Sequence, residues 1–148
     1  MPQSLARVLL HLIFSTKHRE ALITSALRPE LPAYLAGTLE RIHCTPILAG
    51  GPHDHVHVLL GLGRTITIAD MVEQLKTGSS KWAKGKGLPT FAWQAGYGAF
   101  SVSESKAPEV LRYIQGQEEH HRHRTFQEEY RDFLRRHGLE FDERYAWD

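Results

Sequence analysis

Histidines occupy alternate positions within the segment GGPHDHVHVLLGL, residues 50–62. Alternate side chains of a β-strand share one face, so His53, His55 and His57 would project together while Val56 faces the other way. Histidines two residues apart on a strand are roughly 6–7 Å apart, close enough for both rings to reach one divalent ion. His55 and His57 are therefore candidate metal ligands. On spacing alone, the alternative is that they decorate an exposed sheet face.

Two further histidines are candidates for orienting the ligand rings. A metal-bound imidazole uses its second nitrogen for a hydrogen bond that fixes the ring. His53 belongs to the same strand face, and His11 lies on the less apolar face of the N-terminal segment, where the alternative is a packed side chain without a role. A zinc hydrolase using His53, His55 and His57 is disfavoured, because the ligands would be crowded and no glutamate is placed near them as a base.

A nucleophile is suggested by the segment LRYIQGQ, where Tyr113 and Gln117 are four residues apart and share a helix face. A tyrosine can attack a phosphate if a metal polarises that phosphate and a base takes the phenolic proton. The expected helix covers residues 106–123, with Ser105 as its N-cap. The alternative is that Tyr113 is an aromatic residue at the edge of the core and Gln117 a solvated surface residue.

These side chains must be positioned by strands and helices that hydrophobic periodicity predicts. The expected elements are a strand at 5–14, a helix at 28–42, strands at 44–52 and 54–62, a helix at 67–84, a strand at 97–103, the helix at 106–123, and a helix that begins at Thr125 and stops at Gly138. Their order predicts an α+β fold with a ferredoxin-like (RRM-like) antiparallel sheet. Helices would cover one face, and a C-terminal helix would carry the tyrosine. We expect one domain over residues 1–148.

Composition limits the class of protein further. Cys44 is the only cysteine among 148 residues, so no intrachain disulfide forms. No run of about 18 apolar residues occurs, so we expect no membrane span. We expect a cytoplasmic prokaryotic protein that associates with the nucleoid when it acts. The formal net charge is only +1, so any nucleic-acid binding must use local basic patches.

Four sequence segments in this order resemble one family. They are HVH, MVEQLKTGSSKW, WQAGYGAFSVS and YIQGQ, and the resemblance covers about residues 5–135. The chain is similar to the HUH single-tyrosine transposases, which include the insertion-sequence 200/605 type and the REP-associated tyrosine transposases. The resemblance implies that His55 and His57 bind Mg²⁺ or Mn²⁺, that Tyr113 is the nucleophile, and that Gln117 is the third ligand. The REP-associated branch commonly has asparagine there, so the chain resembles the insertion-sequence branch more.

The resemblance also implies a reaction and partners. The family cleaves single-stranded DNA near a hairpin, leaving a 5′-phosphotyrosine link and a free 3′-OH. It forms homodimers, in which the tyrosine helix can act in trans on the partner subunit. The main alternative is a domesticated, non-catalytic module on the same fold that binds single-stranded DNA or an RNA hairpin.

DNA binding requires cations for the phosphates and flat rings for unpaired bases. A solvated lysine face with buried tryptophans is the alternative interpretation of the same residues. The candidates are Lys76, Lys81, Trp82, Lys84, Lys86, Arg122 and Arg124.

Overall fold

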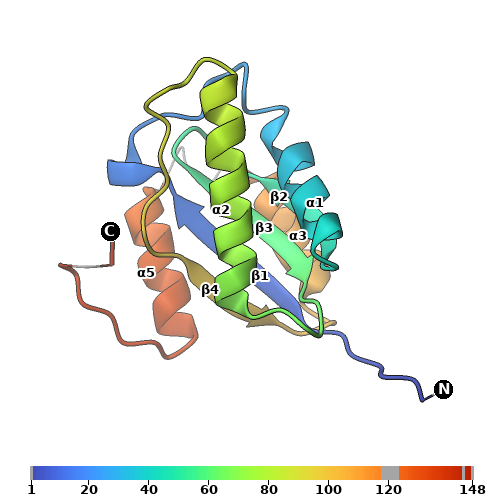
Figure 1. Ribbon diagram of the computed structural model, residues 1–148. Coiled ribbons are helices and arrows are strands. Elements are labelled where there is room, and N and C mark those ends of the chain that lie inside the picture. Colours follow the sequence, from blue (N-terminus) through green and yellow to red (C-terminus); the bar gives the residue numbers. More distant parts are fainter. Residues whose placement is uncertain (1, 118–123, 145, 148) are drawn as a thin grey trace.

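The computed structural model describes residues 2–117, 124–144 and 146–147. Figure 1 shows a sheet with helices packed around it. The elements in chain order are β1 (Leu9–Ser15), the short 3-10 helix η1 (Lys17–Arg19), α1 (Leu31–Arg41), β2 (Thr45–Gly50), β3 (His55–Gly61), α2 (Ile68–Gly85), β4 (Gly98–Val102), α3 (Ala107–Gln115) and α5 (Phe126–Arg136).

The four strands form one antiparallel sheet in the order β2-β3-β1-β4. This topology confirms the predicted ferredoxin-like fold. The strand that carries the histidines is central, and its register with β1 places Ile13 opposite His57 and Ser15 opposite His55. Pairing on both edges fixes β3, so its side chains have defined directions.

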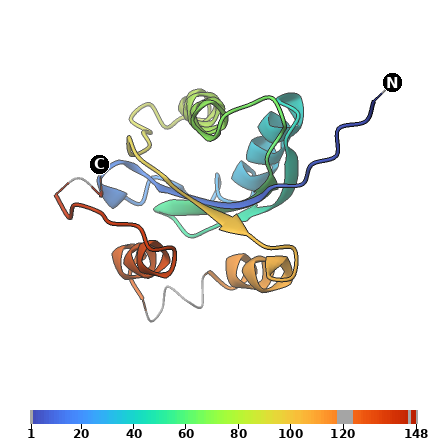
Figure 2. The ribbon, with the colours of Figure 1, turned by 90° about the horizontal axis from the view of Figure 1, so that it is seen from below.

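Two layers of helices cover opposite faces of the sheet. Figure 2 shows α1 and α2 on one side, and α3 and α5 on the other. The first face packs Leu12, Phe14 and Val58 against α1 and α2. The second face packs Ile13 and Phe100 against α5. Because both faces of β1 are covered, both sets of its alternating side chains are buried.

Two expected element boundaries differ from the structure. The first strand begins at Leu9 rather than at residue 5, because β3 and β4 pair with β1 only from Leu9 onward. The tyrosine helix begins after Lys106 instead of Ser105, and it ends at Gln115 with Gly116 as its C-cap. Glycine is a poor helix former, which is consistent with this end. The rest of the expected helix, residues 118–123, lies outside the described residues.

The expected ends of α5 are confirmed. The Thr125 hydroxyl accepts a hydrogen bond from the Glu128 backbone N–H at 3.2 Å, which caps the first turn. Gly138 follows the helix with a φ of 65°, a conformation that favours glycine. None of the helices in the described part of the chain is long and apolar enough to span a membrane.

Candidate active site

The hairpin between β2 and β3 places two histidines on the face that α3 and α5 cover. The side chains of His55 and His57 are both 0% exposed. A Cβ atom on Gly51 would lie 2.4 Å from the His55 carbonyl oxygen, so only glycine allows this close approach. The turn between β2 and β3 therefore requires glycine at position 51, and β3 can then begin at His55.

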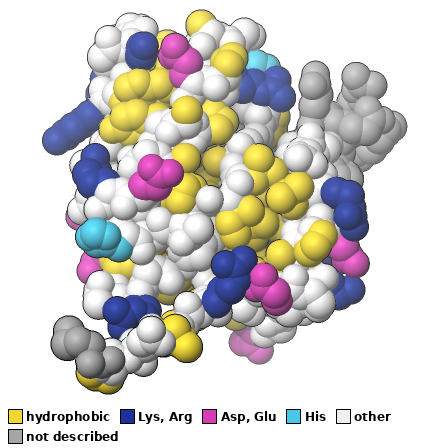
Figure 3. All heavy atoms as spheres, turned by 90° about the vertical axis from the view of Figure 1, so that its right-hand side faces the viewer, with side chains coloured by type: hydrophobic (Ala, Val, Ile, Leu, Met, Phe, Trp, Pro, Cys, Tyr) yellow, Lys and Arg dark blue, Asp and Glu magenta, His cyan; other side chains and the backbone are white. Residues whose placement is uncertain are grey.

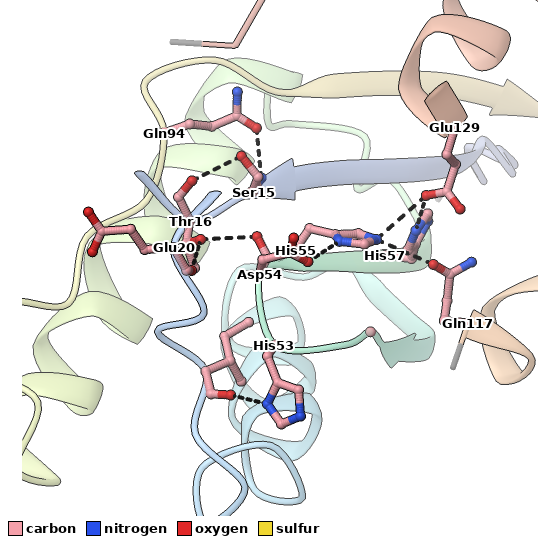
Figure 4. A network of polar contacts seen from close by, with 12 residues as sticks. Ser15, Thr16, Glu20, His53, Asp54, His55, His57, Gln94, Gln117 and Glu129 are labelled. Atoms are coloured by element: carbon pink, nitrogen blue, oxygen red, sulfur yellow. Dashed lines mark hydrogen bonds and ion pairs between the residues drawn. The ribbon is translucent and has the colours of Figure 1, made fainter. Parts of the chain in front are cut away.

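A glutamate from α5 joins the two histidines. The Glu129 Oε1 atom lies 2.8 Å from His57 Nε2 and 3.5 Å from His55 Nε2, and its side chain is 1% exposed. Figure 4 shows the two rings and the carboxylate pointing toward one another. One ligand atom from each of these residues lies within 4.8 Å of the other two, so the cluster has the donors and spacing of a metal site. A buried carboxylate is stable only with such partners.

Gln117 contacts the same His55 nitrogen that faces Glu129. Its Oε1 atom is 3.3 Å from His55 Nε2, and its Nε2 donates to the Tyr113 carbonyl at 3.3 Å. Figure 4 places the amide beside the two histidines, and the side chain is buried. The structure thus brings together His55, His57 and Gln117, the three residues proposed from the sequence as metal ligands.

Tyr113 contacts the same cluster. Its hydroxyl donates a short hydrogen bond to Glu129 Oε2, and its ring centroid is 5.8 Å from that of His57. Burial, followed by the charge and the hydrogen bond of Glu129, raises the pKa of Tyr113 far above its usual value. The phenol therefore keeps its proton at neutral pH, with a carboxylate oxygen in position to accept it.

Each histidine of the cluster has a second partner on its other ring nitrogen. His11 Nε2 and His57 Nδ1 share one hydrogen bond at 2.8 Å, which directs His57 Nε2 toward Glu129. His55 Nδ1 contacts Asp54 Oδ1 at 2.8 Å. Burial lowers the His55 pKa, but hydrogen bonds with Asp54 and Glu129 outweigh it, and the net shift is upward. Burial and the neighbouring His57 hold the His11 pKa well below its usual value.

His53 is not part of the cluster, although its sequence spacing suggested one shared face. β3 begins at His55, and the His53 Nδ1 atom lies 2.6 Å from the Ile23 carbonyl oxygen. Figure 4 shows its ring turned away from His55 and His57. His53 therefore ties the hairpin to the chain at Ile23.

The structure separates most of the basic candidates from this site, whereas the charge of Arg124 reaches Tyr113 and opposes the rise in its pKa. Lys81, Trp82 and Lys84 are on α2, and Lys86 is its C-cap. This helix covers the opposite face of the sheet (Figure 2). Trp82 stacks on Tyr34 with ring centroids 5.0 Å apart. Arg124 forms an ion pair with Asp132 beside α5, and Arg122 lies outside the described residues.

The Lys76 side chain is held by three backbone carbonyl groups of the chain before β4. Its Nζ donates to the carbonyl oxygens of Gln94, Ala95 and Gly96 at 2.8, 3.2 and 2.7 Å. Burial lowers the pKa of the Lys76 amine to about 8, so at pH 7 it is mostly charged and donates all three bonds. The lysine therefore holds the segment that leads into β4.

Replacing Lys76 with methionine is expected to reduce the free energy of unfolding by about 2 kcal/mol, because hydrogen bonds to a charged donor are lost. Urea denaturation at pH 7 measures this change. Lys84→Met on the same helix is the matched control, since Lys84 is exposed and should change stability little. Equal stability of both variants would show that the three carbonyl contacts contribute nothing.

Sequence reasoning missed Glu129, and it wrongly held that no glutamate lies near the histidines. The sequence feature that could have indicated Glu129 is its position within the apolar stripe of α5. Phe126, Tyr130 and Phe133 lie three residues before, one after and four after Glu129. Phe126 and Tyr130 are buried in the second-face core, and Phe133 packs against it. A charge on such a stripe must meet a buried partner.

The structure combines an antiparallel sheet, a buried pair of histidines and an adjacent tyrosine, the features expected of a single-tyrosine transposase. The family model of IS200-like transposases matches residues 4–117. The chain belongs to the IS200-like transposase family. The match stops at Gln117, so Glu129 and the whole of α5 lie beyond it.

Two solved structures share the fold. One, from Deinococcus radiodurans R1 and assigned as a transposase, is 23% identical, with a TM-score of 0.62 over 79% of this chain and 98% of the other. The second is a REP-associated tyrosine transposase bound to a REP hairpin. It is 10% identical, with a TM-score of 0.53 over 79% of this chain and 68% of the other. A comparison with curated proteins gives no significant match.

Proposed function

We propose that this transposase cleaves and rejoins hairpin-associated single-stranded DNA through a 5′-phosphotyrosine intermediate on Tyr113, with the help of a divalent metal. The observation that supports it best is the hydrogen bond from Tyr113 to Glu129, a carboxylate that also contacts His57. The half-buried nucleophile thus contacts the buried proton acceptor and metal donors in one cluster. The fold shared with a transposase bound to a REP hairpin supports a hairpin substrate.

The donor set fits a divalent cation. His55 Nε2, His57 Nε2 and Glu129 Oε1 would hold it, with Gln117 Oε1 next to His55 as a further oxygen donor. Imidazole nitrogens suit transition metals and carboxylate oxygens suit Mg²⁺ and Mn²⁺, so this mixed set favours Mn²⁺ over Mg²⁺. When bound, the metal would draw charge from the scissile phosphate.

Glu129 divides its two oxygens between two tasks. Oε1 faces the histidines, and Oε2 accepts the hydrogen bond from Tyr113. As the Tyr113 oxygen forms its bond to phosphorus, its proton passes to Oε2. The bond from phosphorus to the 3′ oxygen breaks, and that oxygen takes a proton from solvent. Rejoining reverses these steps when the 3′-OH of another strand attacks the phosphotyrosine.

The chain contains every member of this site. Tyr113 on α3 contacts Glu129 on α5 of the same chain, so the proposed reaction takes place in cis. The homodimer stays a prediction, and a tyrosine helix that acts in trans is the alternative to the cis arrangement. The lysines of α2 stay candidates for hairpin binding on a surface remote from the site.

Mixing experiments distinguish the two arrangements. A mixture of a His55→Ala/His57→Ala variant with a Tyr113→Phe variant is expected to remain inactive, because neither chain has a complete site. Cleavage is measured after the mixture has been given time and conditions for subunit exchange. Recovery of activity would show a tyrosine that acts in trans, and it would contradict the cis proposal.

The proposed function is tested with wild-type protein and a pool of single-stranded oligonucleotides that contain randomised hairpins and flanks. We expect cleavage at one side of the hairpin with Mn²⁺, and none after EDTA. Sequencing of the products identifies the cleaved strand and position. Hairpin binding without any cleavage would contradict the proposal and favour a non-catalytic module.

A further inference from the structure

A cavity adjoins the candidate active site between α1, β2 and α3. Its volume is about 490 Å³, which is within the range of small-ligand sites. Gln117 lines this cavity and also contacts His55, so the cavity opens directly beside the metal donors. Figure 3 views the molecule from the side on which α1 and α3 lie, and it shows apolar side chains gathered in patches on this side.

The lining suits an unpaired nucleotide. Pro29, Pro32 and Ile114 supply apolar surface, and apolar side chains can pack against an unpaired base. Arg28 is the one cation among the described lining residues, and none of these is acidic. The Arg28 Nε donates to the Gly51 carbonyl at 3.0 Å, which fixes the guanidinium at the cavity wall. A guanidinium has further N–H groups, which suit a phosphate oxygen.

A second cavity near the site is less suitable. It has a volume of about 710 Å³ and lies beside Asp54 and the start of α5. Two carboxylates, Asp54 and Glu128, line it together with Arg19 and Arg124. Acidic groups oppose a DNA phosphate, so charge favours the first cavity.

We propose that the cavity between α1, β2 and α3 binds the base of one unpaired nucleotide directly next to the scissile phosphate. The inference rests on the proposed function and adds a substrate-specificity site to it. Gln117 connects the cavity with the candidate active site, because its side chain borders the cavity and contacts His55. Arg28 would hold the phosphate of that nucleotide, and the cavity would set the sequence preference at the cleavage position.

The experiment fills the cavity and removes the base. Ser25 is exposed and lines the cavity, so Ser25→Trp occupies it without entering the core. Arg28→Gln removes the cation, and Arg41→Gln, an exposed position at the end of α1, is the control for charge. Each protein is combined with hairpin oligonucleotides that have an abasic residue at one position of the unpaired flank, and every flank position is tested in turn. Kd is measured by fluorescence anisotropy and KM by cleavage, and melting temperatures confirm folding.

For wild type and Arg41→Gln, we expect one abasic position next to the scissile phosphate to weaken binding about 10-fold, because the apolar packing of that base is lost. Ser25→Trp should weaken binding of the intact strand by a similar factor, raise KM with little change in kcat, and show no further loss at that abasic position. Arg28→Gln should also weaken binding.

Two outcomes separate this inference from the proposed function. Absence of cleavage by wild type refutes the proposed function, whereas the Kd pattern of the variants still tests the cavity. If Ser25→Trp and Arg28→Gln bind every oligonucleotide as wild type does, the cavity inference is wrong. It is also wrong if Ser25→Trp and wild type lose the same factor at the abasic position.

Discussion

Replacing Tyr113 with phenylalanine is expected to reduce cleavage on the order of 10⁶-fold, the loss that follows removal of a covalent nucleophile. The variant keeps the ring, which packs against Phe133 with centroids 5.6 Å apart, so the fold and hairpin binding should remain. Only the hydroxyl that donates to Glu129 is lost. Single-turnover cleavage and a binding assay with the same labelled hairpin strand measure the two effects.

Tyr97→Phe is the matched control for this prediction. Tyr97 is 36% exposed, directly precedes β4 and lies beside α2, so its hydroxyl should not affect cleavage. If Tyr113→Phe cleaves at the rate of Tyr97→Phe, the nucleophile has been assigned to the wrong residue.

Replacing His57 with alanine is expected to weaken Mn²⁺ binding more than about 100-fold, beyond the loss that outer partners of a metal site cause. His57 offers its Nε2 to the centre of the cluster, where Glu129 Oε1 lies 2.8 Å away. Calorimetric titration of Mn²⁺ into the purified protein without DNA measures the affinity. Circular dichroism checks that the fold persists, because the imidazole is fully buried.

His53→Ala is the control for the metal titration. It removes a histidine from the same hairpin, but one that contacts Ile23 rather than the cluster, so Mn²⁺ affinity should stay within about twofold of wild type. Glu129→Gln keeps the side-chain volume and should lower both metal affinity and cleavage. Unchanged affinity in His57→Ala would place the metal elsewhere.

The central part of the site could be predicted because it depends on local periodicity. A strand alternates its faces, so the HVH segment alone places His55 and His57 on one side. A helical repeat of about four residues associated Tyr113 with Gln117. In the structure α3 ends at Gln115, and Gln117 reaches Tyr113 and His55 from beyond the Gly116 C-cap. The order of strands and helices then determined the sheet in which these two segments meet, and the antiparallel pairing confirms it.

The remaining parts depend on which face a distant segment covers, and local patterns contain no such information. The capping residues of α5 predicted a helix, but its position over β1 and β4 decides that Glu129 meets His57. Similarly, the sequence does not show that the lysines of α2 lie far from the site. They do so because α2 crosses the opposite face of the sheet. Lys76 shows a related limit, since its three carbonyl partners lie 18 to 20 residues away.

The measurement that tests the proposed mechanism most directly is peptide mapping of a covalent DNA adduct. Wild-type protein is incubated with a cleavable single-stranded hairpin and Mn²⁺, denatured, digested and analysed by mass spectrometry. Tyr130 is the informative competitor, because it is a buried tyrosine next to Glu129, and burial raises its pKa to about 12. The mechanism predicts one 5′-phosphotyrosine link, on Tyr113, and none in Tyr113→Phe. An adduct on Tyr130 or another residue, or cleavage without any adduct, would contradict it.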